Sequence, residues 1–222
     1  MSSDPGFSLD PADPEFQAVW AAASSDTGWA VVDYDPNVWM EMPVLTDPDN
    51  AASDRRTWAR RVADAIWTGY HVDPFEVDRT ALLLTKIAED LGGFKVRAHQ
   101  IFLHLPEPRT MPLPVGLGIW KSARETTEQL RLLVGADDPE AVEPPIVDDF
   151  VTDQLGSGLR CLRYLRDDQE QATLIAALNY AWRVGELETD YRLFTASVDL
   201  GRLTGCIGDI DNLARSIQPI PL

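Results

Sequence analysis

The chain has 222 residues, of which 45% are hydrophobic and 25% charged, a composition typical of a folded globular protein. Its formal net charge of −17 argues against nucleic acids and anionic membrane surfaces as partners, because both are polyanions. No apolar run reaches the roughly 18 residues of a membrane span, and residues 1–13 lack the basic and apolar regions of a signal peptide. We therefore expect a cytoplasmic protein without a membrane partner.

The charged residues are unevenly distributed along the chain. Residues 1–54 hold 11 acidic side chains and no lysine or arginine, and residues 137–153 hold seven acidic side chains and no basic one. Sixteen of the 19 basic residues are arginines. An Arg-rich, Asp-rich balance is typical of GC-rich coding sequences, such as actinobacterial ones, and of salt-adapted cytosols, so the acidity has explanations other than function.

The first half of the chain predicts helices followed by a hairpin. Residues 1–14 are expected to form a flexible acidic arm, and one domain is expected over residues 15–222. Apolar periodicity and cap residues predict a short helix, a strand, two longer helices and two strands. In chain order these cover residues 15–23, 29–34, 53–70, 78–91, 94–105 and 115–121. A helix over residues 122–134, capped by Ser122, follows them.

The second half predicts a run of strands and a closing helix. Four strands are expected over residues 146–154, 158–166, 172–184 and 190–198, and their short connections favour antiparallel pairing. Asp199 is predicted to cap an amphipathic helix that runs to about residue 217. The predicted fold class is α+β, with a central antiparallel sheet packed by several helices.

No recognisable motif for catalysis, a cofactor or a metal is present. The sequence lacks GxGxxG after a strand, GxxxxGK[ST], GxSxG and HExxH. His99 and His104 are five residues apart in one predicted strand, which places them on opposite faces. Cys161 and Cys206 lie outside any CxxC pattern, and Cys161 is expected to be buried and unreactive. We therefore predict no catalytic, cofactor-binding or metal residues, although a metal site assembled from distant carboxylates would leave no such motif.

Two groups of cationic and polar residues are candidate anion or partner surfaces. The first comprises Arg55, Arg56, Arg60 and Arg61, which crowd the start of a predicted helix, where positive charge opposes the helix dipole. Two candidate sources of negative charge would balance these arginines: the acidic residues just upstream, or an external anion. The second group is a predicted polar face of the sheet, comprising Arg97, His99, Tyr164, Asn179, Arg183 and Arg192. It is expected to be a solvated face, an anion or partner surface, or a face covered by the acidic N-terminal arm.

The C-terminal part of the chain has one further pattern. Residues 158–217 read as strand, strand, strand and a final amphipathic helix that ends Leu213-Ala214-Arg215-Ser216-Ile217. This third of the chain resembles uncharacterised actinobacterial cytosolic proteins with a Mog1/PsbP-like α+β pattern. The resemblance implies a late helix packed on an antiparallel sheet, and a role in partner binding or assembly rather than catalysis. It carries no functional residue over to this chain.

Three functions remain open from the sequence. The first is a non-enzymatic partner-binding protein of accessory, chaperone-like or immunity type, whose acidic surface suits a basic protein. The second is a small-molecule binder or enzyme with a site between the sheet and the helices. The third is a structural or assembly subunit that docks through the aromatic, acidic N-terminal segment.

Overall fold

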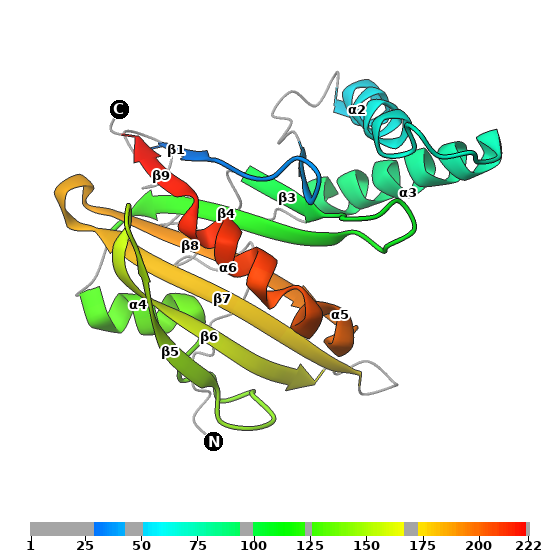
Figure 1. The fold of residues 1–222 in the computed structure, drawn as a ribbon. Coiled ribbons are helices and arrows are strands. Elements are labelled where there is room, and N and C mark those ends of the chain that lie inside the picture. The colour runs from blue at the N-terminus through cyan, green and yellow to red at the C-terminus, as the bar shows by residue number, and fades with distance from the viewer. Residues whose placement is uncertain (1–28, 43–50, 94–99, 123–125, 167–172, 221–222) are drawn as a thin grey trace. The chain divides into compact units, whose positions relative to one another are not determined.

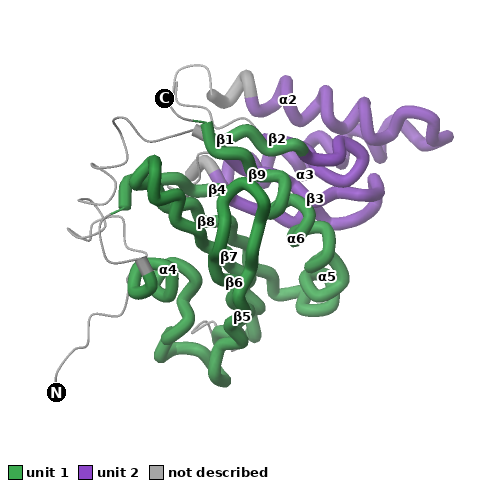
Figure 2. Tube along the Cα trace, turned by 60° about the vertical axis from the view of Figure 1, so that its left-hand side comes forward, with its two compact units in different colours: residues 1–33, 117–222 green, residues 34–116 purple. Residues whose placement is uncertain are grey.

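The computed structural model describes residues 29–42, 51–93, 100–122, 126–166 and 173–220. The chain divides into two compact units, one formed by residues 1–33 and 117–222 and the other by residues 34–116 (Figure 2). The expectation of a single domain over residues 15–222 remains a prediction, and the division into two compact units does not decide it.

The unit of residues 34–116 combines a helical hairpin with short strands. It contains β2 (Trp39–Met42), α2 (Ala51–Ile66), α3 (Pro74–Gly93), β3 (Gln100–His104) and the first residues of β4 (Leu113–Lys121). Strands β2 and β3 pair antiparallel, with Trp39 opposite His104. The small residues Ala59 and Ala63 lie one turn apart on α2 and are fully buried with Leu84 of α3. Their short side chains let the two helices approach closely.

The unit of residues 1–33 and 117–222 is built on four long antiparallel strands (Figure 1). These are β5 (Ile146–Thr152), β6 (Gly156–Arg166), β7 (Leu174–Val184) and β8 (Thr189–Ser197), and each pairs with the next along the chain. The full sheet has the order β2-β3-β4-β8-β7-β6-β5. A separate pair is formed by β1 (Trp29–Val32) and β9 (Ile217–Ile220).

Helices cover both faces of this four-stranded region. Ala181 of β7 packs with Leu130, Leu133 and Val134 of α4 (Thr126–Val134). The neighbouring residue Tyr180 donates a hydrogen bond to Asp211 of α6 (Ile207–Arg215) at 2.6 Å. Since successive residues of a strand point to opposite faces, α4 and α6 lie on opposite faces of the sheet.

The predicted α+β class and the antiparallel sheet are confirmed. The four long strands agree with the predicted ones to within two residues at each end. Asp199 caps α5 (Leu200–Gly205) as predicted, because its Oδ1 accepts a hydrogen bond from the backbone N–H of Arg202 at 2.8 Å. The predicted arm, the helix over residues 15–23 and strand residues 94–99 lie outside the described residues.

One predicted element, the closing helix, needs correction, and the short strand β2 was not predicted. The closing helix is interrupted at Cys206, which separates α5 from α6, and it ends at Arg215. Ile217, expected on that helix, begins strand β9. The helix predicted over residues 122–134 is described as α4 from Thr126 to Val134, and the predicted cap at Ser122 stays a prediction because residues 123–125 lie outside the described residues. The Ser122 hydroxyl donates a hydrogen bond to Asp190 at 2.9 Å. Strand β2 was not predicted, because its four residues are too few to show an alternating pattern.

Within the described residues, no helix is long and apolar enough to cross a membrane.

Candidate functional site

The positive charge of the first predicted group, the arginines of α2, is only partly balanced by carboxylates among the described residues. Arg60 pairs with Asp64 one turn later at 3.0 Å and with Asp78 of α3 at 2.5 Å. The described residues offer no ion-pair partner to Arg55, Arg56 or Arg61. Arg60 is thus neutralised by downstream carboxylates, which the sequence analysis did not consider. All its contacts are exposed, so these pairs contribute little stability.

The second predicted group does not form one face of the sheet. Tyr164 pairs with Ala176, whereas Asn179 pairs with Cys161, three residues further along β7. An odd separation along a strand means opposite faces, so Tyr164 points away from the face that carries Asn179. Arg183 and Arg192 share the face of Asn179, and Arg97 and His99 lie outside the described residues. The prediction of a single cationic face over these strands is therefore wrong.

Arg183 is already neutralised within the protein. Its Nε and Nη2 donate to the two carboxylate oxygens of Asp190 at 2.6 and 2.9 Å. The side chain of Asp190 is fully buried and also accepts the hydrogen bond from Ser122. A bidentate pair of this kind fixes the β7–β8 hairpin end and leaves Arg183 little capacity for an external anion.

Arg192 has a different environment from Arg183. Its Nη2 donates to Oδ1 of Asn179 at 2.9 Å, and its guanidinium lies 5.0 Å from the centre of the Phe194 ring. No carboxylate among the described residues forms an ion pair with it. Its Nε is buried and has no hydrogen-bond partner. Burial, and then the positive charge of Arg163, lower the pKa of Arg192 to about 10, so it remains charged at neutral pH.

Arg163 belongs to the same cluster, although the sequence analysis did not single it out. It lies on β6 opposite Ala177, on the face that carries Asn179. Its Nη1 donates to Asp138 at 2.6 Å, in a pair whose two side chains are only 16% and 18% exposed. Its Nε is also buried without a partner. The sequence indicates only that Arg163 lies two residues after Cys161 and therefore on the same face of the predicted strand. We call Asn179, Arg163 and Arg192 the arginine cluster.

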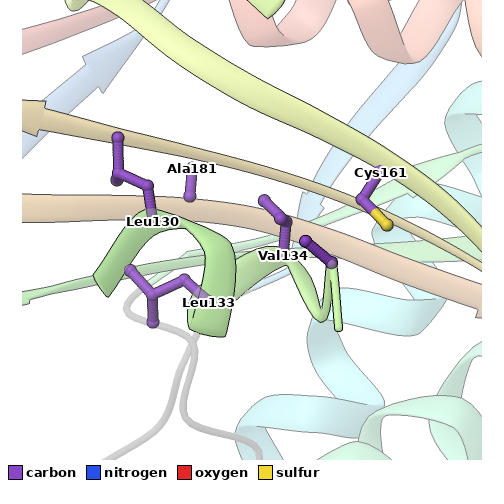
Figure 3. Packing of buried hydrophobic residues seen from close by; sticks show 6 residues of the cluster. Leu130, Leu133, Val134, Cys161 and Ala181 are labelled. Atoms are coloured by element: carbon purple, nitrogen blue, oxygen red, sulfur yellow. The ribbon is translucent and has the colours of Figure 1, made fainter. Parts of the chain in front are cut away.

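Apolar side chains of helix α4 pack against the sheet beside the arginine cluster. Figure 3 shows Leu130, Leu133 and Val134 of α4 against Ala181 and Cys161 of the sheet. The Asn179 amide donates to the carbonyl of Val134 at 3.3 Å, which turns its oxygen toward Arg192. Burial raises the pKa of the Cys161 thiol, so the thiol stays protonated and unreactive, in line with its predicted burial.

Strand β5 presents a second candidate surface, which is acidic. It is the terminal strand in the order of the described sheet, so one of its edges has no neighbouring described strand. Asp149 and Asp153 are exposed, and the described residues provide no ion-pair partner for either. Asp148 pairs with Arg160 at 2.8 Å.

The same edge also carries exposed apolar side chains. Val142, Ile146 and Val151 are 49%, 52% and 64% exposed. Val142 continues the line of β5 along β6, because its N–H donates to the carbonyl of Tyr164 at 2.8 Å. In general, a strand edge without a neighbouring strand, with apolar side chains among its charges, is a template to which a further strand can be added. We call residues 142–153 the acidic edge.

The described residues contain no group of three or more His, Cys, Asp or Glu side chains placed to hold a metal ion. No protein-family model matches the chain, and a search of curated proteins found no match. The site must therefore be interpreted from its own residues.

Proposed function

We propose that the protein is a non-enzymatic binding factor, of accessory, chaperone-like or immunity type, that captures a basic protein partner along the acidic edge. The observation that carries the proposal is the outer side of β5, beside which no described strand lies and where exposed apolar side chains lie among carboxylates. An extended segment of the partner would add a strand there through backbone hydrogen bonds.

The negative charge of the acidic edge favours a positively charged partner. Residues 137–153 contain seven carboxylates and no basic residue, and the whole chain carries a net charge of −17. A second copy of the chain would bring like charges opposite each other across the new strand pair, which is unfavourable. A basic segment would instead be attracted, and long-range attraction accelerates its association.

Partner capture from a cell extract, followed by affinity measurements with the purified partner, tests the proposal. Asp149→Lys and Val151→Lys place positive charge on the acidic edge and should weaken binding about tenfold or more. Glu186→Lys makes the same charge change as Asp149→Lys at an exposed position outside the edge and is the matched control. Affinity for wild type should fall as salt concentration rises.

Hydrogen exchange locates the contact directly. The outward backbone N–H groups of β5 should exchange rapidly in the free chain and become protected in the complex. A partner that binds both lysine variants as tightly as wild type, or protects other segments only, would show that the edge is not the binding surface. Failure to capture any partner, or the finding of a specific self-association, would contradict the proposed function itself.

A further inference from the structure

The arginine cluster contains more positive than negative charge at a partly buried place. Arg163 has Asp138 as its partner, but among the described residues Arg192 contacts the neutral amide oxygen of Asn179 and the face of Phe194 and pairs with no carboxylate. Removing a guanidinium from water without a compensating anion is unfavourable, and each buried N–H without an acceptor adds to the cost. Within the arginine cluster this cost arises at Nε of Arg163 and at Nε of Arg192.

The local structure holds Arg192 in place without neutralising it. The Val134 carbonyl orients the Asn179 amide, and the amide oxygen in turn accepts from Nη2 of Arg192. The guanidinium lies over the Phe194 ring on the same strand, which is a cation–π arrangement. As a whole residue Arg192 is mostly buried but not fully enclosed, so part of its surface remains accessible to solvent.

The charge balance at Arg192 differs from that at Arg160 and Arg183. Two other arginines on the sheet have carboxylate partners: Arg160 pairs with Asp148 and Asp211, and Arg183 pairs with Asp190. With 36 acidic and 19 basic residues, the chain has ample carboxylates. The absence of a carboxylate at Arg192, among the described residues, is therefore informative.

We propose that the arginine cluster is a binding site for a small oxyanion, a phosphate or carboxylate group, with Arg192 as its principal ligand and Arg163 as the second positive charge. Guanidinium groups bind both anions through paired N–H donors, and a partly desolvated site strengthens such charge-assisted hydrogen bonds. The lowered pKa of Arg192 is consistent with this site, because a bound anion would stabilise the charged guanidinium and raise its pKa again. The inference is independent of partner binding at the acidic edge.

Titration of the full chain with inorganic phosphate, and separately with malonate, tests the site. Sodium chloride at the same ionic strength is the reference for screening. The readout is the ¹H–¹⁵N signal of the Arg192 Nε–H group, together with the thermal midpoint. A saturable shift of that signal, and a rise of the midpoint beyond the chloride reference, are expected for at least one of the two anions. The anion that saturates at the lower concentration identifies the class of ligand.

Arg192→Met identifies the residue responsible. Replacing an unpaired, partly buried charge by an apolar side chain of similar length should leave the fold intact. Anion affinity should fall about tenfold or more, since a charge-assisted hydrogen bond is lost. The matched control is Arg166→Met, the same change at an exposed position on the opposite face of β6, which should retain wild-type affinity.

Two results would overturn the inference. One is the lack of any saturable response of wild type to either anion beyond that to chloride. The other is an equal response of wild type and Arg192→Met, which would show that the anions act elsewhere. The wild-type titration decides the matter even if Arg192→Met does not fold.

Discussion

At the residue scale, Gly158 determines how β6 and β7 pack. It pairs with Trp182, whose ring is fully buried and stacks on Tyr180 with their centres 5.9 Å apart. A Cβ at this position would overlap the Trp182 ring and the carbonyl oxygen of Ala181. The carbonyl belongs to the backbone of β7, an interior strand of the sheet, and cannot move aside as a flexible side chain would.

Gly158→Ala is therefore predicted to lower the free energy of unfolding by about 1 to 3 kcal/mol, the usual cost of overpacking a core. Gly208→Ala is the control, because Gly208 is exposed on α6 with no atom within 4 Å of a new Cβ. That substitution should stabilise the protein by up to about 1 kcal/mol, through the higher helix propensity of alanine. Urea denaturation of both variants measures the two effects, and a neutral Gly158→Ala would contradict the packing described here.

The sequence predicts some properties of single residues and not others. The alternation of β6 correctly predicted the burial of Cys161. It did not predict the environment of Arg192, because the absence of a carboxylate depends on which residues of β6, β7 and α4 surround it. For the same reason Tyr164 was wrongly grouped with Asn179: the face of each strand was predictable, but the register between strands was not.

At the scale of elements, one carboxylate attaches α6 to the sheet. Asp211 accepts hydrogen bonds from the Tyr180 hydroxyl of β7 at 2.6 Å and from Arg160 of β6 at 3.1 Å. Arg160 also reaches Asp148 of β5, so the same arginine connects the edge strand to the helix. The described helix on this face is thus held by a polar network as well as by Ile210 and Leu213, which are buried.

Asp211→Ala is predicted to lower the free energy of unfolding by about 1 to 3 kcal/mol, because it leaves the buried Tyr180 hydroxyl without its acceptor. Asp209→Ala, on the same helix, removes the same charge at a position whose side chain does not bind Tyr180. Chemical denaturation should show the larger loss for Asp211→Ala. Equal losses for the two variants would indicate that only helix charge or propensity is involved.

The same network predicts a dependence of stability on alkaline pH. Burial, followed by the hydrogen bond and the negative charge of Asp211, raises the pKa of Tyr180 far above its usual value of about 10. The folded state then keeps the phenolic proton at a pH where the unfolded state loses it. This stabilisation is complete below about pH 10 and is lost as pH rises above that value, by about 1.4 kcal/mol per pH unit for one group.

Tyr180→Phe tests this dependence, because phenylalanine has no proton to lose. The variant should be less stable than wild type at pH 8, and the difference should shrink between about pH 10 and 11. Urea unfolding at several pH values measures it. Burial also raises the pKa values of Tyr34 and Tyr191, but both are present in wild type and variant alike and cancel in the comparison. A difference that stays constant with pH would contradict the buried state of Tyr180.

Long elements were predictable, whereas short ones paired over long distances were not. Strands β6 and β7 have 11 residues each and show clear patterns. Strand β9 has four residues, Ile-Gln-Pro-Ile, and pairs with β1 near the other end of the sequence. Its first residue fitted the apolar period of the preceding helix, and nothing local indicates that the chain changes direction after Arg215. Pairing between distant segments is a property of the fold rather than of the local sequence.

At the scale of the whole molecule, the two units differ in charge. Residues 34–116 hold 12 acidic and nine basic side chains, whereas the remainder holds 24 acidic and ten basic ones. The unit that contains the acidic edge therefore carries most of the net charge. Within it, the arginine cluster is a local region of opposite sign. This contrast supports two separate binding surfaces, one for a basic protein segment and one for a small anion.

The net charge of −17 also predicts how salt affects stability. Two effects of salt oppose each other: it screens the repulsion among unpaired carboxylates, and it weakens attractive ion pairs. The ion pairs of α2 and α3 are largely exposed, as shown by the 53% and 55% exposure of Arg60 and Asp64, and such pairs contribute about 0 to 1 kcal/mol each. Repulsion should therefore dominate.

We expect the urea midpoint at pH 7 to rise as sodium chloride increases from about 0.01 M to about 1 M, over which the Debye length falls from about 30 Å to 3 Å. Potassium chloride should act equally, because screening does not distinguish the two cations. Since chloride is itself an anion, the same series in Arg192→Met separates screening from occupation of the arginine cluster: screening raises the midpoint in both proteins, whereas anion binding raises it in wild type alone. A midpoint that falls with salt in both proteins would mean that ion pairs such as Arg163–Asp138 outweigh the repulsion among carboxylates.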